Sequence, residues 1–137
     1  MKSTDLMIDD WVFSCIASKY VQVIELFGTY AKCTKYRRIA SRDNEVIEDY
    51  KNLSPIELTS EILKKNGFSR ENSRTGYMFA YSEYRDNKGD FDLYICNGVR
   101  KGSTCEEINE FQFTAIRYVH ELQHALKLCK IEKEIVL

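Results

Sequence analysis

Hydrophobic and polar residues alternate in several short runs within the first fifty residues. The runs at 11–15, 20–27 and 29–33 are rich in β-branched and aromatic residues, and Gly28 separates the last two. Alternation with a period of two is typical of strands that bury one face. The pattern therefore predicts a hairpin or meander, with a less regular closing strand at 45–50.

A short helix is predicted to begin after Thr59 and to end at Gly67. The Thr59 hydroxyl can cap the amino terminus, and Glu61 lies in the first turn, where the helix dipole favours a negative charge. Gly67 can adopt the left-handed conformation that ends a helix, and Phe68 can then pack back on Leu63. These signals predict a helix of two turns.

The pattern of period two returns in the second half of the chain. Residues 77–84 and 91–96 read as two antiparallel strands, and the second places its apolar and polar residues on opposite faces. The turn dipeptide Asn97-Gly98 predicts a third strand from Val99. A last strand is expected within 108–115.

The apolar period becomes helical from about Ile116 to Lys130. One stripe of this helix collects its apolar residues, which are Val119, Leu122, Ala125, Leu126 and Cys129. On the helical wheel His120 and His124 lie far from this stripe. We therefore expect both imidazoles to project outward.

Together these elements predict an α+β protein. Its parts are an amino-terminal small β-barrel-like meander of the Src-homology-3 type, a short helix, an antiparallel sheet and a carboxy-terminal helix packed across that sheet. The 137 residues are the usual size of a single compact domain. Because residues 51–58 offer a seam, the domain can divide into a barrel-like unit, 1–54, and a sheet-plus-helix unit, 55–137.

Composition and charge narrow the classes of partner. The formal net charge is −1, with 20 basic and 21 acidic residues, so the protein as a whole lacks a field that would gather nucleic acid or an anionic membrane. The five cysteines are widely spaced and form no C-x-x-C pair, which predicts reduced thiols. No signal peptide or membrane span is evident, so we expect a cytoplasmic protein without a membrane partner.

The only stretch that spells a catalytic motif is His-Glu-Leu-Gln-His at 120–124. In zinc proteases two histidines at this spacing bind the metal, and the intervening glutamate, here Glu121, is the general base. A working site needs a third protein ligand. Cys129 lies on the apolar stripe, Glu132 and Glu134 follow too closely, and no spacing supports the more distant Asp86, Asp90 or Asp92. We expect no metal, cofactor or catalytic residue, and a zinc-dependent hydrolase through His120, Glu121 and His124 is an alternative.

A basic run around Tyr36 is a candidate contact for nucleic acid. It consists of Lys35, Arg37, Arg38 and Arg42, and cations interleaved with an aromatic residue can bind phosphates on a small barrel. Four acidic residues follow at once and cancel much of the local field; they are Asp43, Glu45, Glu48 and Asp49. A solvated charged loop is therefore the preferred interpretation, with nucleic-acid binding as the alternative.

Three segments resemble a family of small uncharacterised proteins from gut bacteria and their prophages or mobile elements. These segments are Ile8-Asp9-Asp10-Trp11-Val12, then Pro55 to Thr59 with Glu61 to Phe68, and Tyr118-Val119-His120-Glu121-Leu122-Gln123-His124. The resemblance spans most of the chain but does not include 32–50. In that family the glutamate of the last segment is often glutamine, so the resemblance implies a structural role for the helix and no protease activity.

The sequence supports a binding or adaptor role better than a catalytic one. Phe and Tyr are abundant, at seven and nine residues, and aromatic side chains are enriched at protein interfaces. The sequence contains no Gly-rich phosphate-binding loop, no nucleophile elbow and no pair of carboxylates at a spacing typical of acid–base catalysis. We therefore expect a non-enzymatic protein that contacts another protein or a second copy of itself.

Overall fold

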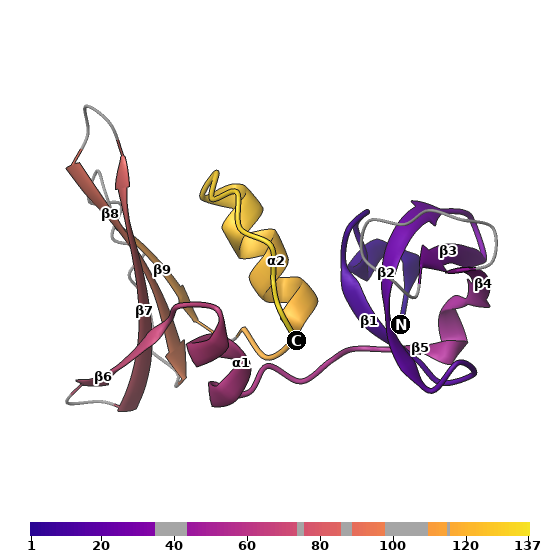
Figure 1. Ribbon diagram of the computed structural model, residues 1–137, viewed down its shortest axis with the longest axis horizontal. Helices are drawn as coiled ribbons and strands as arrows, with labels where there is room; N and C mark the ends of the chain where they lie inside the picture. The colour runs from indigo at the N-terminus through magenta and orange to yellow at the C-terminus, as the bar shows by residue number, and fades with distance from the viewer. Residues whose placement is uncertain (35–43, 74–75, 86–88, 98–109, 115) are drawn as a thin grey trace. The chain divides into compact units, whose positions relative to one another are not determined.

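The computed structural model describes residues 1–34, 44–73, 76–85, 89–97, 110–114 and 116–137 (Figure 1). The chain forms two compact units, and each unit is built from two separate stretches of sequence. Unit 1 comprises Met1–Glu57 and Tyr118–His124, and unit 2 comprises Leu58–Arg117 and Ala125–Leu137. The architecture is α+β, as the sequence predicts.

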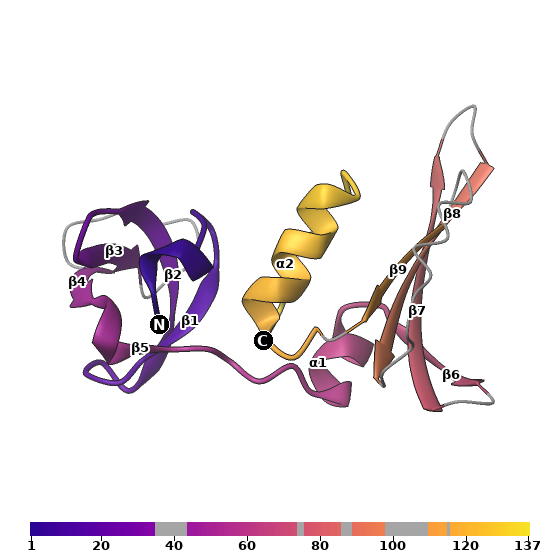
Figure 2. The ribbon, with the colours of Figure 1, turned by 180° about the vertical axis from the view of Figure 1, so that it is seen from behind.

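Unit 1 contains a five-stranded antiparallel sheet with the strand order β4-β3-β2-β1-β5. The strands are β1 Trp11–Ser14, β2 Lys19–Leu26, β3 Tyr30–Thr34, β4 Glu45–Asp49 and β5 Leu53–Ser54, with short 3-10 helices η1 at Ser3–Asp5 and η3 at Tyr50–Asn52. The sheet curls into a half-barrel, which both views show (Figures 1 and 2). All four strands expected before residue 51 are confirmed, including the irregular one.

The half-barrel is open among the residues that the structure describes. There β4 pairs only with β3, and β5 pairs only with β1. A shift in register between Val23 and Glu25 interrupts the β2–β3 ladder, and such irregularities bend a strand and increase its twist. The observed element is therefore a curled sheet.

The concave side of the half-barrel holds the core of unit 1. Its buried members are Leu6, Val12, Val21, Val23, Ala31, Cys33, Tyr50 and Leu53. Because side chains alternate along a strand, burial of Val12 and Ser14 places Trp11 and Phe13 on the opposite face. The side chain of Trp11 is accordingly half-buried and lies outside this cluster.

Helix α1, Ser60–Lys65, opens unit 2 and has the predicted ends. The Thr59 hydroxyl accepts a hydrogen bond from the Ile62 amide at 3.2 Å. Beyond the helix Gly67 has φ +83°, and the amides of Gly67 and Phe68 donate to the carbonyls of Lys64 and Leu63. These two bonds form a Schellman motif, which satisfies the last helical carbonyls.

The sheet of unit 2 has the strand order β6-β7-β8-β9. Its strands are β6 Ser69–Ser73, β7 Gly76–Arg85, β8 Gly89–Asn97 and β9 Glu110–Thr114. The sequence predicted β7, β8 and β9 but not β6, whose residues are all polar. The prediction of a wholly antiparallel sheet is wrong, because β8 and β9 are parallel. The strand expected from Val99 lies outside the described residues.

Helix α2, Val119–Leu128, belongs to both units: its residues to His124 are part of unit 1 and those from Ala125 are part of unit 2. The apolar stripe is buried as expected, with Val119, Leu122 and Leu126 at most 1% exposed. The carboxy-terminal tail that follows is held by α1, since the Asn66 side-chain amide exchanges two hydrogen bonds of 2.8 Å with the Val136 backbone. Neither α1 nor α2, nor any other described helix, has the length and hydrophobicity needed to cross a membrane.

Candidate functional site

The turn that leads into β1 is fixed to β2 by its backbone. Asp9 has a positive φ of 76°, a conformation that Asp tolerates better than most residues. The Asp9 amide donates to the Val23 carbonyl at 2.8 Å, and the Val23 amide donates to the Asp10 carbonyl at 2.9 Å. These bonds place the side chain of Asp10 in the interior of unit 1.

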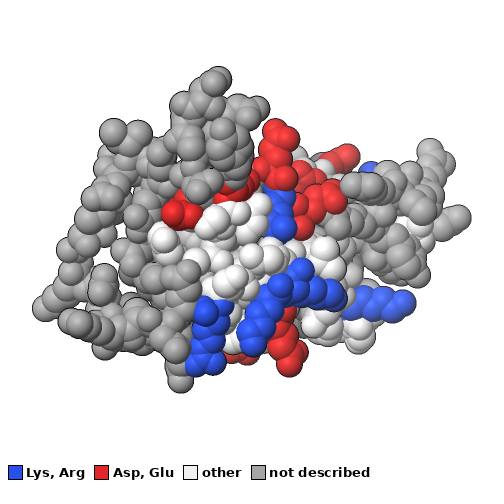
Figure 3. All heavy atoms as spheres, turned by 60° about the vertical axis from the view of Figure 1, so that its left-hand side comes forward, with Lys and Arg blue, Asp and Glu red and all other residues white. Residues whose placement is uncertain are grey.

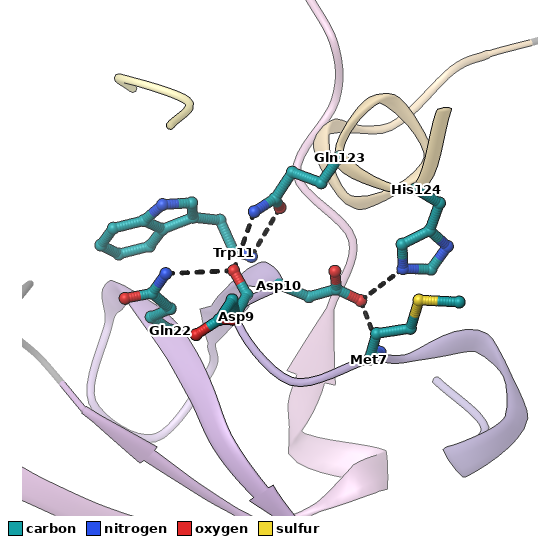
Figure 4. A network of polar contacts seen from close by, with 7 residues as sticks. All are labelled: Met7, Asp9, Asp10, Trp11, Gln22, Gln123 and His124. Atoms are coloured by element: carbon teal, nitrogen blue, oxygen red, sulfur yellow. Dashed lines mark hydrogen bonds and ion pairs between the residues drawn. The ribbon is translucent and has the colours of Figure 1, made fainter. Parts of the chain in front are cut away.

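Asp10 and His124 meet within this interior (Figure 4). The Asp10 side chain is 0% exposed, and its Oδ2 lies 2.8 Å from Nε2 of His124. The same oxygen accepts a hydrogen bond of 2.7 Å from the Met7 amide. The other oxygen, Oδ1, is buried and has no hydrogen-bond partner. The contact is an ion pair whenever His124 is protonated.

Burial dominates the electrostatics of Asp10. It raises the pKa of the carboxyl above the ordinary 3.8, against the opposing effects of the Met7 hydrogen bond and of His124. A carboxylate out of water is unfavourable unless charges or donors compensate it. The Met7 amide and His124 together supply the contacts that make a buried Asp10 tolerable.

Gln123, next to His124, ties the helix to the same turn. Its Oε1 accepts from the Trp11 amide and its Nε2 donates to the Asp9 carbonyl, both at 2.8 Å. The Asp9 carbonyl also accepts a bond of 3.1 Å from the Gln22 side chain. One side-chain amide thus satisfies a donor and an acceptor of the backbone at the start of β1, as a neighbouring strand would (Figure 4).

His120 is buried one turn before His124. It is 5% exposed, its ring stacks on Tyr118 with centroids 5.8 Å apart, and its edge contact with His124 is also 5.8 Å between centroids. Its Nδ1 has no hydrogen-bond partner. Burial lowers the pKa of His120 below the ordinary 6.5, against the opposing charges of Asp10 and Glu121.

The expectation that both imidazoles project outward is therefore wrong. The wheel assigned one buried stripe to the helix, whereas residues 118–124 bury a second, polar face within unit 1. We call these contacts the α2 clamp: His120, Gln123 and His124 on the helix, with Asp9, Asp10 and Trp11 on the turn. The sequence contained a signal for it, because His120, Gln123 and His124 occupy i, i+3 and i+4 positions, which share one helix face.

Glu121 has a structural contact at the start of α2. Its Oε2 accepts a hydrogen bond of 3.1 Å from the amide of Tyr118, the residue that precedes the helix. A glutamate at the third helical position commonly caps the amino terminus in this way. The glutamate of the motif is thus oriented toward the backbone of its own first turn.

The donors that a zinc hydrolase would need are not assembled in the described part of the chain. No group of three or more His, Cys, Asp or Glu side chains there is arranged to hold a metal ion. Cys129 is buried with the apolar stripe, and Asp92 accepts a hydrogen bond from Ser82 on the neighbouring strand. His124 uses its Nε2, the usual metal-binding nitrogen, to contact Asp10.

A second buried polar group lies inside the half-barrel. Glu48 is 2% exposed, and its carboxylate accepts a hydrogen bond of 2.5 Å from the Ser14 hydroxyl. Burial, and secondarily the charge of Glu48, raises the pKa of the Cys33 thiol to about 12. The prediction had placed Glu48 among solvated acidic residues. Glu48 is buried because its side chain lies on the inward-facing side of β4, the side it shares with its pairing partner on β3, the buried Ala31.

The basic residues predicted to meet phosphates, Lys35, Arg37, Arg38 and Arg42, lie outside the described residues. In the view of Figure 3 both basic and acidic side chains are visible. The surface drawn there therefore carries charges of both signs. In unit 1 the Lys32 ammonium lies 2.9 Å from Glu45 and 3.9 Å from Glu25, which neutralises charge on the outer face of the sheet.

Comparisons with known proteins add no identification. No family model, curated protein or solved structure matches this chain.

Proposed function

We propose that this protein is a non-enzymatic binding module and that its partner is another protein, bound through the β1–β2 hairpin. The observation that carries the proposal is the exposure of large apolar side chains on this hairpin. Ile16 in the turn is 70% exposed and Tyr20 on β2 is 50% exposed. With Phe13 they form what we call the hairpin patch. Clustered exposed apolar residues, unlike single ones, are typical of interaction sites.

The hairpin patch is preorganised. Phe13 and Tyr20 are directly paired across β1 and β2, and their rings make an edge contact with centroids 5.9 Å apart. A partner therefore meets aromatic surface that is already ordered, so little side-chain entropy is lost on binding. Trp11, two residues before Phe13 on the same face, extends this surface along β1.

The contacts of the α2 clamp favour binding over hydrolysis. Glu121 caps its own helix and His124 contacts Asp10, so these two residues of the motif already have structural partners. The resemblance to small proteins of gut bacteria and mobile elements implies the same preference. A closed barrel of the Src-homology-3 type for the first half of the chain is part of this proposal.

A photo-crosslinking experiment tests the proposal. A photoreactive phenylalanine at position 20 is irradiated in a lysate of the native host, and adducts are identified by mass spectrometry. We expect one discrete adduct, with a protein or with a second copy of this chain. Ile16→Asp should reduce its yield about tenfold, the effect of losing about 1.4 kcal/mol of binding.

Ile47→Asp is the matched control. Ile47 is also 70% exposed but lies on β4, away from the hairpin in sheet order. We expect this variant to keep the adduct. The proposal fails if position 20 gives no discrete adduct, or if both Asp variants reduce the yield equally.

A further inference from the structure

We propose that the α2 clamp is operated by protons: at neutral pH it holds residues 118–124 against the turn before β1, and it opens as the solution becomes mildly acidic. The inference goes beyond the proposed binding role and does not depend on it. It begins from two buried polar atoms without partners, Nδ1 of His120 and Oδ1 of Asp10. Both belong to titratable groups of one cluster.

His120 is the group whose protonation favours the open state of the clamp. In the closed clamp it is 5% exposed and stacked between Tyr118 and the edge of His124. The free imidazole in water binds a proton near pH 6.5, but the closed site binds it less readily, chiefly because the ring is buried. Protons therefore bind preferentially to the open state, and lowering the pH shifts the equilibrium toward opening.

The charges around His120 do not reverse this sign. The carboxyls of Asp10, Glu121 and Asp5 favour its protonation, while His124 opposes it, and burial has the largest effect. Asp10 comes from the turn, Asp5 from η1, and Glu121 and His124 from α2 itself. His124 is moreover already in contact with the Asp10 carboxylate, with Nε2 2.8 Å from Oδ2.

Asp10 acts in the opposite direction, starting from an ordinary pKa of 3.8 that lies below the 6.5 of histidine. Burial raises its pKa above 3.8, so the closed state binds this proton better than the open state, and closure regains stability as Asp10 becomes neutral. The opening caused by His120 begins below pH 6.5. The two groups together predict a clamp that loosens between neutral and mildly acidic pH.

The backbone amide of Trp11 reports the clamp directly, because it donates to Oε1 of Gln123. We expect its hydrogen-exchange protection factor, measured by NMR on the full chain, to fall between pH 7 and pH 5 by up to tenfold per pH unit, the limit for one linked proton. The Phe68 amide in unit 2, which donates to Leu63, should keep its protection factor over this range. Trp11 is the single tryptophan of the chain, so its fluorescence should change over the same range.

Two variants separate His120 from its neighbours. His120→Phe keeps an aromatic ring against Tyr118 and removes the proton site, so the Trp11 protection factor should become independent of pH between 7 and 5. His124→Gln retains His120, so it should lower protection at pH 7 but keep the dependence on pH.

The inference is overturned if the wild-type protection factor of Trp11 is constant from pH 7 to pH 5. It is also overturned if His120→Phe retains the wild-type dependence. Should His120→Phe not fold, the NMR titration of the His120 ring in the wild type decides. Coincidence of this titration with the loss of Trp11 protection supports the clamp, and titration without that loss rejects it.

Discussion

Three buried side chains of unit 1 each leave one polar atom without a hydrogen-bond partner: Asp10, Glu48 and His120. An unsatisfied buried polar atom costs about 1–3 kcal/mol, a large fraction of the stability of a small domain. All three residues also contact another polar or titratable side chain. Asp10 and His120 lie in the α2 clamp and Glu48 lies inside the half-barrel, so unit 1 buries polar side chains at two separate places.

The cysteines of unit 1 provide a prediction at the scale of single residues. Cys33 is fully buried and has a pKa of about 12, whereas Cys15 is exposed in the turn after β1. The thiolate is the reactive form, and at pH 8 a thiol with this pKa is almost entirely protonated. We expect iodoacetamide at pH 8 to modify Cys15 within minutes and to leave Cys33 unmodified for hours, as peptide mass spectrometry can measure.

Unfolding in urea is the control for this labelling. It should bring Cys33 to the rate of Cys15, since the protection comes from burial and from Glu48. Equal rates in the folded protein would contradict the burial of Cys33. The variant Glu48→Gln should leave Cys33 protected, because burial is the larger of the two causes.

The residues of the α2 clamp were the least predictable from the sequence. A helical wheel ranks positions by hydropathy, so His120 and His124 were expected to project outward. Their partners Asp9, Asp10 and Trp11 lie more than 100 residues away along the chain. The spacing of the helical residues was visible, but only the tertiary structure supplies the turn that satisfies them.

At the scale of elements, the sequence predicted correctly those features that depend on interactions between residues close together in the chain. The ends of α1 follow from Thr59 and Gly67, whose hydrogen bonds involve residues within four positions. Strand β6 was missed because its sequence, Ser-Arg-Glu-Asn-Ser, has no apolar alternation, and it forms by pairing with β7. The parallel pairing of β9 with β8 was missed because the direction in which two strands pair is a long-range property that the sequence of either strand does not reveal.

The end of α1 gives a prediction at this scale. Gly67 has φ +83°, and a Cβ there would meet only side-chain atoms at 3.9 Å or more. Space is sufficient, so the cost of Gly67→Ala should come from the left-handed backbone alone, about 1–2 kcal/mol. Urea unfolding should show this loss as a lower midpoint.

Gly28→Ala is the matched control for that measurement. Gly28 has no atom within 4 Å of an added Cβ, and its φ lies outside the left-handed range. The substitution should change the free energy of unfolding by less than about 0.5 kcal/mol. Equal losses in the two variants would show that the Schellman motif does not depend on glycine.

At the scale of the whole molecule, the chain passes between its two units more than once. The first stretch of unit 1 ends at Glu57, and the segment Tyr118–His124 then returns to it. This return is supported by hydrogen bonds, because the Val119 amide donates to the Ile56 carbonyl at 2.9 Å and Glu57 forms a β-bridge with Tyr118. The order of the predicted elements suggested a seam at 51–58, but no local feature of the sequence indicated that a helical segment would rejoin unit 1.

The zinc content of the purified protein distinguishes the structural contacts of unit 1 from the active site of a zinc hydrolase. A catalytic zinc site needs three protein ligands and an open position. In unit 1 the Asp10–His124 contact uses the nitrogen that a metal would need, and Glu121 caps the helix. We expect less than about 0.1 zinc per chain by elemental analysis after dialysis, because two histidines without a third donor bind the ion only weakly.

His124→Ala and Asp10→Asn distinguish a structural pair from a metal ligand set. If the pair is structural, both variants should lose stability, by about 3–5 kcal/mol for His124→Ala, which leaves the buried carboxylate unpaired. Asp10→Asn should lose less, because a neutral amide is less unfavourable in the interior than an unpaired carboxylate. One tightly held zinc per wild-type chain, released in both variants, would instead show that these side chains converge on a metal, and the binding role would have to be abandoned for a hydrolase.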